Sequence, residues 1–96
     1  MAGYILVDIE STDDEGRVRY VEGVGATVQA YGGEFLASTP EVKVLEGESL
    51  VNNRLVLIRF PTGERALEWY GSDQYEPLHR IREQSANTKM IFFESA

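Results

Sequence analysis

The sequence predicts an α+β fold, in which helices cover one face of an antiparallel sheet. Two patterns support this prediction: runs rich in β-branched and aromatic residues alternate with helical segments, and glycine or proline separates them. The order of the segments is β-α-β(β)-β-α-β. Because the chain has 96 residues, we expect one domain over residues 1–96, built around a single core.

The composition excludes several kinds of site. The chain contains no cysteine and one histidine, which rules out disulfides, thiolate chemistry and histidine-rich metal sites. Its net charge of −7 repels the phosphates of nucleic acids. No apolar run approaches the roughly 20 residues of a membrane span, and the N-terminal MAGYILVDIE lacks the basic start of a signal peptide. We therefore expect a cytoplasmic protein with no metal or cofactor and with neither nucleic acid nor membrane as a partner.

The first third of the chain predicts a strand followed by a helix. Tyr4–Glu10 is rich in β-branched residues and has the usual length of a strand. Thr12 and Glu15 have the spacing of a capping box, which predicts a helix from there to about Tyr31, ended by Gly32-Gly33. The predicted buried stripe of this helix consists of Tyr20, Val24, Thr27, Val28 and Tyr31.

Gly23 and Gly25 lie inside this helix, where we expect them to allow close approach to the sheet. After the helix, Glu34–Ala37 and Glu41–Glu46 predict two short strands, or one bent strand interrupted by a proline. A polar turn is predicted over residues 47–53.

The later strands, Arg54–Phe60 and Lys89–Glu94, are mostly apolar on both faces. In the first of them, one face carries Val56, Ile58 and Phe60, and the other carries Leu55, Leu57 and Arg59. In the second, Met90 and Phe92 oppose Ile91 and Phe93. When helices cover one face of a sheet, the other face is ordinarily polar and exposed to water. We therefore expect the identical sheet of a second molecule to cover this face, related by a twofold axis.

Two helices are predicted between these strands. Thr62 caps a helix over Gly63–Tyr70, which Gly71 ends. Pro77 suits the first position of a separate helix, which continues to about Ala86. The predicted inward stripe of that helix consists of Leu78, Ile81 and Ser85.

Several short segments carry a resemblance to a known family. They are Asp8-Ile9-Glu10 with Thr12-Asp13, Ala30-Tyr31-Gly32-Gly33 with Phe35-Leu36, Val44-Leu45-Glu46-Gly47, Leu57-Ile58 with Phe60-Pro61, Trp69-Tyr70 with Ser72 and Tyr75, Leu78 with Arg82, and Thr88–Glu94. Through them the chain resembles, over nearly its whole length, the family called domain of unknown function 1330, within the dimeric α+β barrel superfamily. The resemblance implies a ferredoxin-like protomer and a homodimer whose sheets face each other, with no established reaction. Arg59, where relatives carry an acidic residue, and Arg17, where a bulky residue is expected, depart from the pattern.

The candidate pocket residues lie mostly within residues 69–82. They are Trp69, Tyr70, Tyr75, His79 and Arg82, together with Arg59 on the sheet. His79 is the candidate catalytic base, or else pairs with Glu83 four residues later. Trp69 and the tyrosines bind a ligand or fill the core, and Arg82 holds a carboxylate or pairs with an acidic residue across the dimer.

Three functions remain open. The first is a homodimeric protein that binds a small apolar or acidic ligand, favoured because no nucleophile, metal set or phosphate loop occurs in the sequence. The second is a cofactor-independent enzyme, similar to monooxygenases or isomerases, acting on a small phenolic or carbonyl compound, as the superfamily resemblance implies. The third is a structural or accessory dimer. A pocket between the helix at His79 and the sheet favours the first two functions, and a packed interior favours the third.

Overall fold

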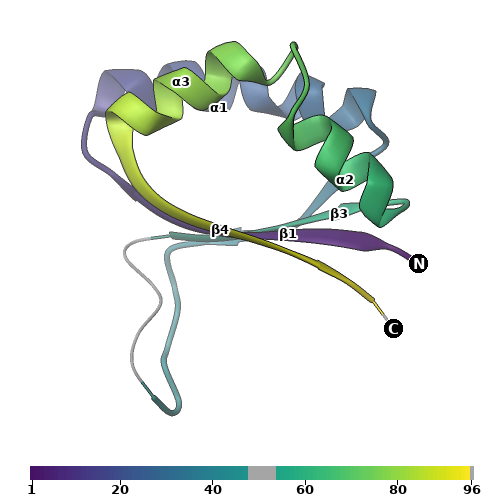
Figure 1. Ribbon diagram of the computed structural model, residues 1–96. Coiled ribbons are helices and arrows are strands. Elements are labelled where there is room, and N and C mark those ends of the chain that lie inside the picture. The colour runs from purple at the N-terminus through teal and green to yellow at the C-terminus, as the bar shows by residue number, and fades with distance from the viewer. Residues whose placement is uncertain (48–53, 96) are drawn as a thin grey trace.

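The computed structural model describes residues 1–47 and 54–95. Its elements are β1 (Gly3–Ser11), α1 (Asp14–Ala30), β2 (Glu34–Thr39), β3 (Arg54–Phe60), α2 (Gly63–Tyr70), α3 (Glu76–Ser85) and β4 (Ala86–Glu94). The strands form one antiparallel sheet in the order β2-β3-β1-β4, and the helices lie on one face of it (Figure 1). The predicted ferredoxin-like α+β fold is therefore confirmed. Within the described ranges, none of the helices has both the length and the apolar character needed to cross a membrane.

Each strand sends alternate side chains to opposite faces of the sheet, as predicted. On the helix side, Ile5 of β1 pairs with Ile58 of β3 and with Phe92 of β4. The opposite side, here called the open face, carries the apolar side chains of Tyr4, Leu6, Leu55, Leu57, Ile91 and Phe93. None of the helices in the described part of the chain covers the open face (Figure 1).

The helix α2 brings large aromatic side chains into the core. Thr62 caps it as predicted, because the Arg65 amide donates a hydrogen bond of 3.1 Å to the Thr62 hydroxyl. The fully buried Trp69 has its ring centroid 5.5 Å from that of Phe60 and 4.2 Å from that of Tyr75. These rings form an aromatic core beside α2.

The inward face of α3 agrees with the predicted one only in part, because Ser85 is buried as expected and Leu78 packs at the edge of the core. Its buried residues are Arg82 and Ser85, whereas Leu78 and Ile81 are only half-buried. The reason is that α3 packs against α1: a Cβ added to Gly23 would lie 2.8 Å from the Leu78 side chain. Gly23 therefore allows close approach between two helices, and the prediction that it allows approach to the sheet is wrong.

The predicted capping box at the start of α1 does not form. The N-cap residue is Asp13, and no side chain makes a capping hydrogen bond there. Instead, the amides of Thr12 and Asp13 both donate to the carbonyl of Ser85, at 2.7 and 3.2 Å. A backbone contact with the end of α3 thus fixes the start of α1. At its other end the prediction is confirmed, because Gly32 adopts a φ of 77° and its amide donates to Gln29.

The predicted strand over Glu41–Glu46 is wrong. The strand β2 continues to Thr39, and residues 41–47 form no strand. Pro40 has no N–H to donate to a neighbouring strand, which explains why the ladder stops there. The chain then extends below the sheet, on the side away from the helices (Figure 1). Beyond residue 47, the predicted polar turn over residues 47–53 lies outside the described residues.

Candidate functional site

A cavity of about 740 Å³ lies between α1 and the sheet. It exists because α1 packs mainly against α3, whereas α2 packs directly on β1, β3 and β4. Apolar side chains form much of its wall, namely Val7, Ile9, Val24, Phe35, Val56 and Ile58. This volume and this kind of lining are typical of a site for a small molecule.

Small residues leave this space open. Gly25 of α1 lines the cavity, and a Cβ added there would meet no atom within 4 Å. Ser38 of β2 and Ala86 of β4 also line it. The large rings of Trp69 and Phe60 are buried beside α2 instead. The aromatic core and the cavity therefore divide the space between the helices and the sheet.

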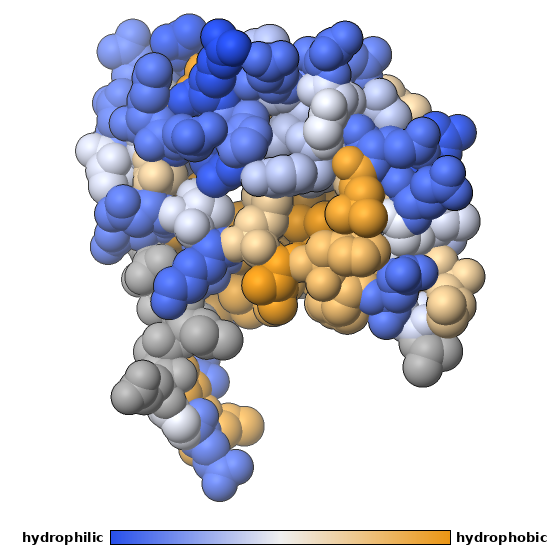
Figure 2. Space-filling view, viewed as in Figure 1, coloured by the Kyte–Doolittle hydropathy of each residue, from blue (hydrophilic) through white to orange (hydrophobic). Residues whose placement is uncertain are grey.

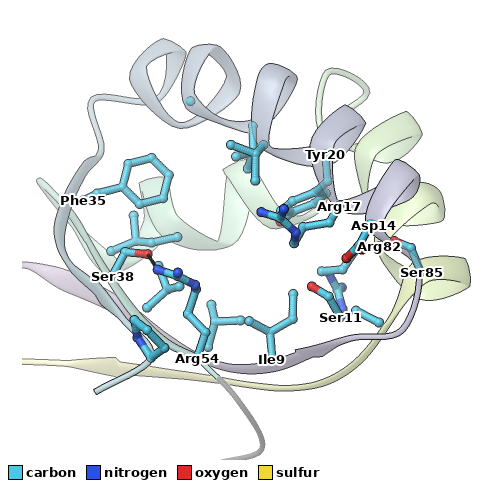
Figure 3. Close-up of a pocket in the computed structure, with 18 residues that line it drawn as sticks. Ile9, Ser11, Asp14, Arg17, Tyr20, Phe35, Ser38, Arg54, Arg82 and Ser85 are labelled. Carbon is cyan, nitrogen blue, oxygen red and sulfur yellow. Dashed lines mark hydrogen bonds between the residues drawn. The ribbon is translucent and has the colours of Figure 1, made fainter. Parts of the chain in front are cut away.

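Charged residues are distributed unevenly around the cavity. The described residues that line it include the arginines Arg17, Arg54 and Arg82 but only one carboxylate, that of Asp14. The chain as a whole has the opposite bias, with nine basic and sixteen acidic residues. Figure 3 shows Arg17 and Arg54 extending from opposite sides into the space beneath α1. The cavity is thus a locally basic site in an acidic protein.

Arg82 is the buried member of these arginines, with 6% of its surface exposed. Its Nε donates a hydrogen bond of 3.2 Å to the Tyr75 hydroxyl, which lies 2.8 Å from the hydroxyl of Tyr20. Burial, reinforced by the neighbouring Tyr75, raises the pKa of the Tyr20 phenol. Tyr20 therefore remains neutral at physiological pH. Within the described residues, no carboxylate forms an ion pair with Arg82.

The predicted pocket residues lie in several different parts of the structure. Of these residues, Arg82 lines the cavity. Trp69 and Tyr75 are fully buried. The Trp69 indole donates to the Thr27 hydroxyl at 3.0 Å, and Tyr75 joins Arg82 to Tyr20. Tyr75 thus supports a cavity residue from behind without lining the cavity.

The remaining candidates lie farther from the cavity. Tyr70 is 41% exposed, and its ring centroid is 5.2 Å from that of His79. The His79 Nε2 lies 3.2 Å from the Glu83 carboxylate, as one of the two interpretations of the sequence expects. Arg59 lies on the open face, 3.5 Å from Glu34. The cavity therefore lies beneath α1, and α3 lines it with Arg82 and Ser85 but not with His79.

Sequence reasoning missed most of the polar residues at the cavity. Tyr20 belonged to the predicted buried stripe of α1 but was not considered a ligand contact. Arg17 is three residues before Tyr20 and thus on the same side of the helix, so a charged residue beside an apolar stripe was the available signal. Arg54 begins β3 and carried no such signal, because its place beneath α1 depends on the pairing of distant strands.

The fold and the cavity together define a class: a ferredoxin-like α+β protein with a small-molecule-sized cavity between a helix and its sheet. More particularly, the chain belongs to the family described as "Domain of unknown function (DUF1330)", which matches residues 2–96. Comparison with curated protein sequences finds no match.

Solved structures share this fold at low sequence identity. A protein of unknown function from Rhodopseudomonas palustris is 12% identical with a TM-score of 0.79, and the match covers 99% of this chain and 82% of that chain. A dimeric ferredoxin-like protein of unknown function from Jannaschia sp. CCS1 is 15% identical with a TM-score of 0.73, covering 99% and 100%. SnoaB, a cofactor-independent oxygenase from Streptomyces nogalater, is 11% identical with a TM-score of 0.60, covering 99% and 91%. At these identities the likeness establishes the fold alone.

Proposed function

We propose that this chain is a homodimeric protein that binds a small, largely apolar molecule in the cavity between α1 and the sheet. The observation that carries the proposal is the cavity of about 740 Å³, which has apolar walls and a few polar groups. Proteins pack their interiors closely, so a space of this size beside a well-packed aromatic core favours a ligand site over a structural role.

The groups at the cavity favour binding over chemistry. A general base has to accept a proton at neutral pH, and the raised pKa of the Tyr20 phenol prevents it from doing so. His79 does not line the cavity. Among the described lining side chains, Asp14 is the only carboxylate, and it is exposed at the surface. Arginine and tyrosine side chains instead provide hydrogen bonds that orient a ligand.

The homodimer is supported by the open face. Ile91 and Phe93 of β4 are 53% and 43% exposed there, and the Phe93 ring stacks on Tyr4 with centroids 5.1 Å apart. Figure 2 shows apolar side chains gathered at the level of the sheet, below a polar helical layer. A contiguous apolar face of this kind marks an interface, and a second copy offers a complementary one. The Jannaschia protein with this fold is dimeric.

The binding proposal is tested by filling the cavity. Gly25→Leu places a side chain in the open space, whereas Ala26→Leu adds the same apolar group at the next position, which is exposed. Isothermal titration would measure the binding of 2-naphthoate and 2-naphthamide to each variant. We expect the wild type and Ala26→Leu to bind at least one of these compounds, and Gly25→Leu to bind it at least about tenfold more weakly. Equal binding by both variants, or no binding by the wild type, contradicts the proposal.

A second candidate is a cofactor-independent oxygenase, the activity of SnoaB. The observation in its favour is the hydrogen-bonded series Tyr20, Tyr75 and Arg82, which ends at the cavity and is suited to hold a phenolic oxygen. Oxygen uptake with 1-naphthol as substrate, measured for the wild type and for Tyr20→Phe, tests it. Uptake that is lost in the variant supports this candidate, and the absence of uptake in the wild type rejects it for this substrate.

A further inference from the structure

We infer that the cavity takes a carboxylic acid with an apolar body and that Arg82 holds the carboxylate. The inference rests on the proposed function, because it names the chemical class of the ligand for the same cavity. Three observations carry it: the burial of Arg82, the partners of its guanidinium and the composition of the cavity wall.

A buried guanidinium is costly unless an opposite charge compensates it. Arg82 is 6% exposed and lines the cavity, so most of its charge is removed from water. Its hydrogen bond in the structure goes from Nε to the neutral hydroxyl of Tyr75. The Tyr20 hydroxyl is a further hydrogen-bonding neighbour of the guanidinium, and no described carboxylate forms an ion pair with its terminal nitrogens. These nitrogens have the planar geometry that matches the two oxygens of a carboxylate.

The rest of the cavity agrees with an anion. Arg17 and Arg54 also line it, and both are exposed, so they lie where a ligand enters. Neither forms an ion pair with a described carboxylate, although Arg54 donates to the Ser38 hydroxyl at 3.1 Å. The chain as a whole has a net charge of −7, which repels anions. These arginines attract an anion locally, at the cavity.

The apolar wall determines the rest of the ligand. Val7, Val24 and Ile58 are buried side chains that line the cavity, and the Phe35 ring extends into it from β2 (Figure 3). A free inorganic anion would leave these surfaces without a partner. A carboxylate joined to an aromatic or aliphatic body satisfies both Arg82 and the apolar wall.

The experiment compares two compounds of nearly identical shape at neutral pH, the anion 2-naphthoate and the neutral 2-naphthamide. For the wild type, we expect naphthoate to bind about tenfold to hundredfold more tightly than the amide, as for a charge-assisted hydrogen bond. Arg82→Gln should remove this preference, because it weakens the binding of naphthoate about tenfold or more beyond any effect on the amide. Arg19→Gln, an exposed arginine on α1 outside the cavity, changes the net charge equally and should keep the preference.

The possible outcomes separate this inference from the proposed function. If the amide binds as tightly as naphthoate, or if Arg82→Gln keeps the preference, the inference is overturned and small-molecule binding stands. If the wild type binds neither compound, both proposals fail. Should Arg82→Gln not fold, the wild type still decides the matter by nuclear magnetic resonance: the Nε–H signal of Arg82 should shift further with naphthoate than with the amide. An unchanged signal on naphthoate binding overturns the inference.

Discussion

The Trp69 indole donates a hydrogen bond of 3.0 Å to the hydroxyl of Thr27 and so joins α2 to α1. The Thr27 hydroxyl in turn donates to the Val24 carbonyl at 2.7 Å, one turn earlier in α1. Both side chains are buried. This contact connects the aromatic core to α1, the helix that covers the cavity.

Replacing Thr27 with Val keeps the volume of the side chain but leaves the Trp69 N–H without its acceptor. We expect Thr27→Val to lower the free energy of unfolding by about 1–3 kcal/mol, the usual cost of a buried unsatisfied donor. Urea unfolding followed by far-ultraviolet circular dichroism measures it, since Trp69 is the only tryptophan in the sequence, and the exposed Thr12→Val is the control. In a double-mutant cycle with Trp69→Phe, additive effects would show that the hydrogen bond contributes nothing.

The raised pKa of Tyr20 predicts a loss of stability in alkaline solution. Tyrosine in an unfolded chain has a pKa of about 10, whereas the folded protein retains this proton at higher pH. The contribution of Tyr20 is thus fully present below about pH 10. Above that pH the unfolded state loses the proton first, so the free energy of unfolding falls.

Tyr20→Phe removes this titration. The free energy of unfolding of the variant should therefore decline less steeply above pH 10, by up to about 1.4 kcal/mol per pH unit for one group. Urea unfolding at a series of alkaline pH values measures both slopes. Identical slopes for the variant and the wild type would contradict the assignment of a shifted pKa to Tyr20.

An aspartate on the open face should prevent dimerisation. Leu57 lies at the centre of that face, opposite Leu6 of β1 and Ala37 of β2. Burying an unpaired carboxylate between two apolar sheets is costly, so Leu57→Asp should sediment as a monomer while the wild type sediments as a dimer. Leu67→Asp, on the exposed side of α2, is the matched control and should remain dimeric. A wild type that sediments as a monomer at micromolar concentration would contradict the sheet-to-sheet interface.

Removing the only histidine tests whether the outer side of α3 takes part in function. His79→Ala breaks the contact with Glu83, which is largely exposed, so its effect on stability should stay below about 1 kcal/mol. Since His79 does not line the cavity, the affinity for 2-naphthoate should change less than about twofold. Loss of binding with unchanged thermal stability would place the site at α3 instead.

Much of the fold was predictable because it depends on local pattern. The alternation along β3 and β4 assigned the apolar side chains to the correct faces, and Thr62, Gly32 and Pro77 marked helix ends correctly. Prediction failed where a distant segment replaced a local interaction. The carbonyl of Ser85, which is distant in the sequence, accepts hydrogen bonds from the amides of Thr12 and Asp13. This contact replaces the expected capping box.

The candidate site was less predictable for the same reason. The sequence singled out Arg82, which lines the cavity, but grouped it with His79 and Tyr70, which do not. Residues on one short helix are close in sequence yet point in different directions, and spacing alone does not show which side faces the interior.

The sequence by itself determined most of the elements of this protein and the two apolar faces of its sheet, because these follow from residue type and periodicity. It also indicated the family, through the segments that carry the resemblance. Only the tertiary structure decided where the cavity lies and which arginine side chain is buried in its wall. Both depend on tertiary packing, in which α1 lies against α3 at Gly23 and Leu78 while the large rings gather beside α2. Arg82 faces the cavity because α3 packs against α1, which no local pattern in the sequence records.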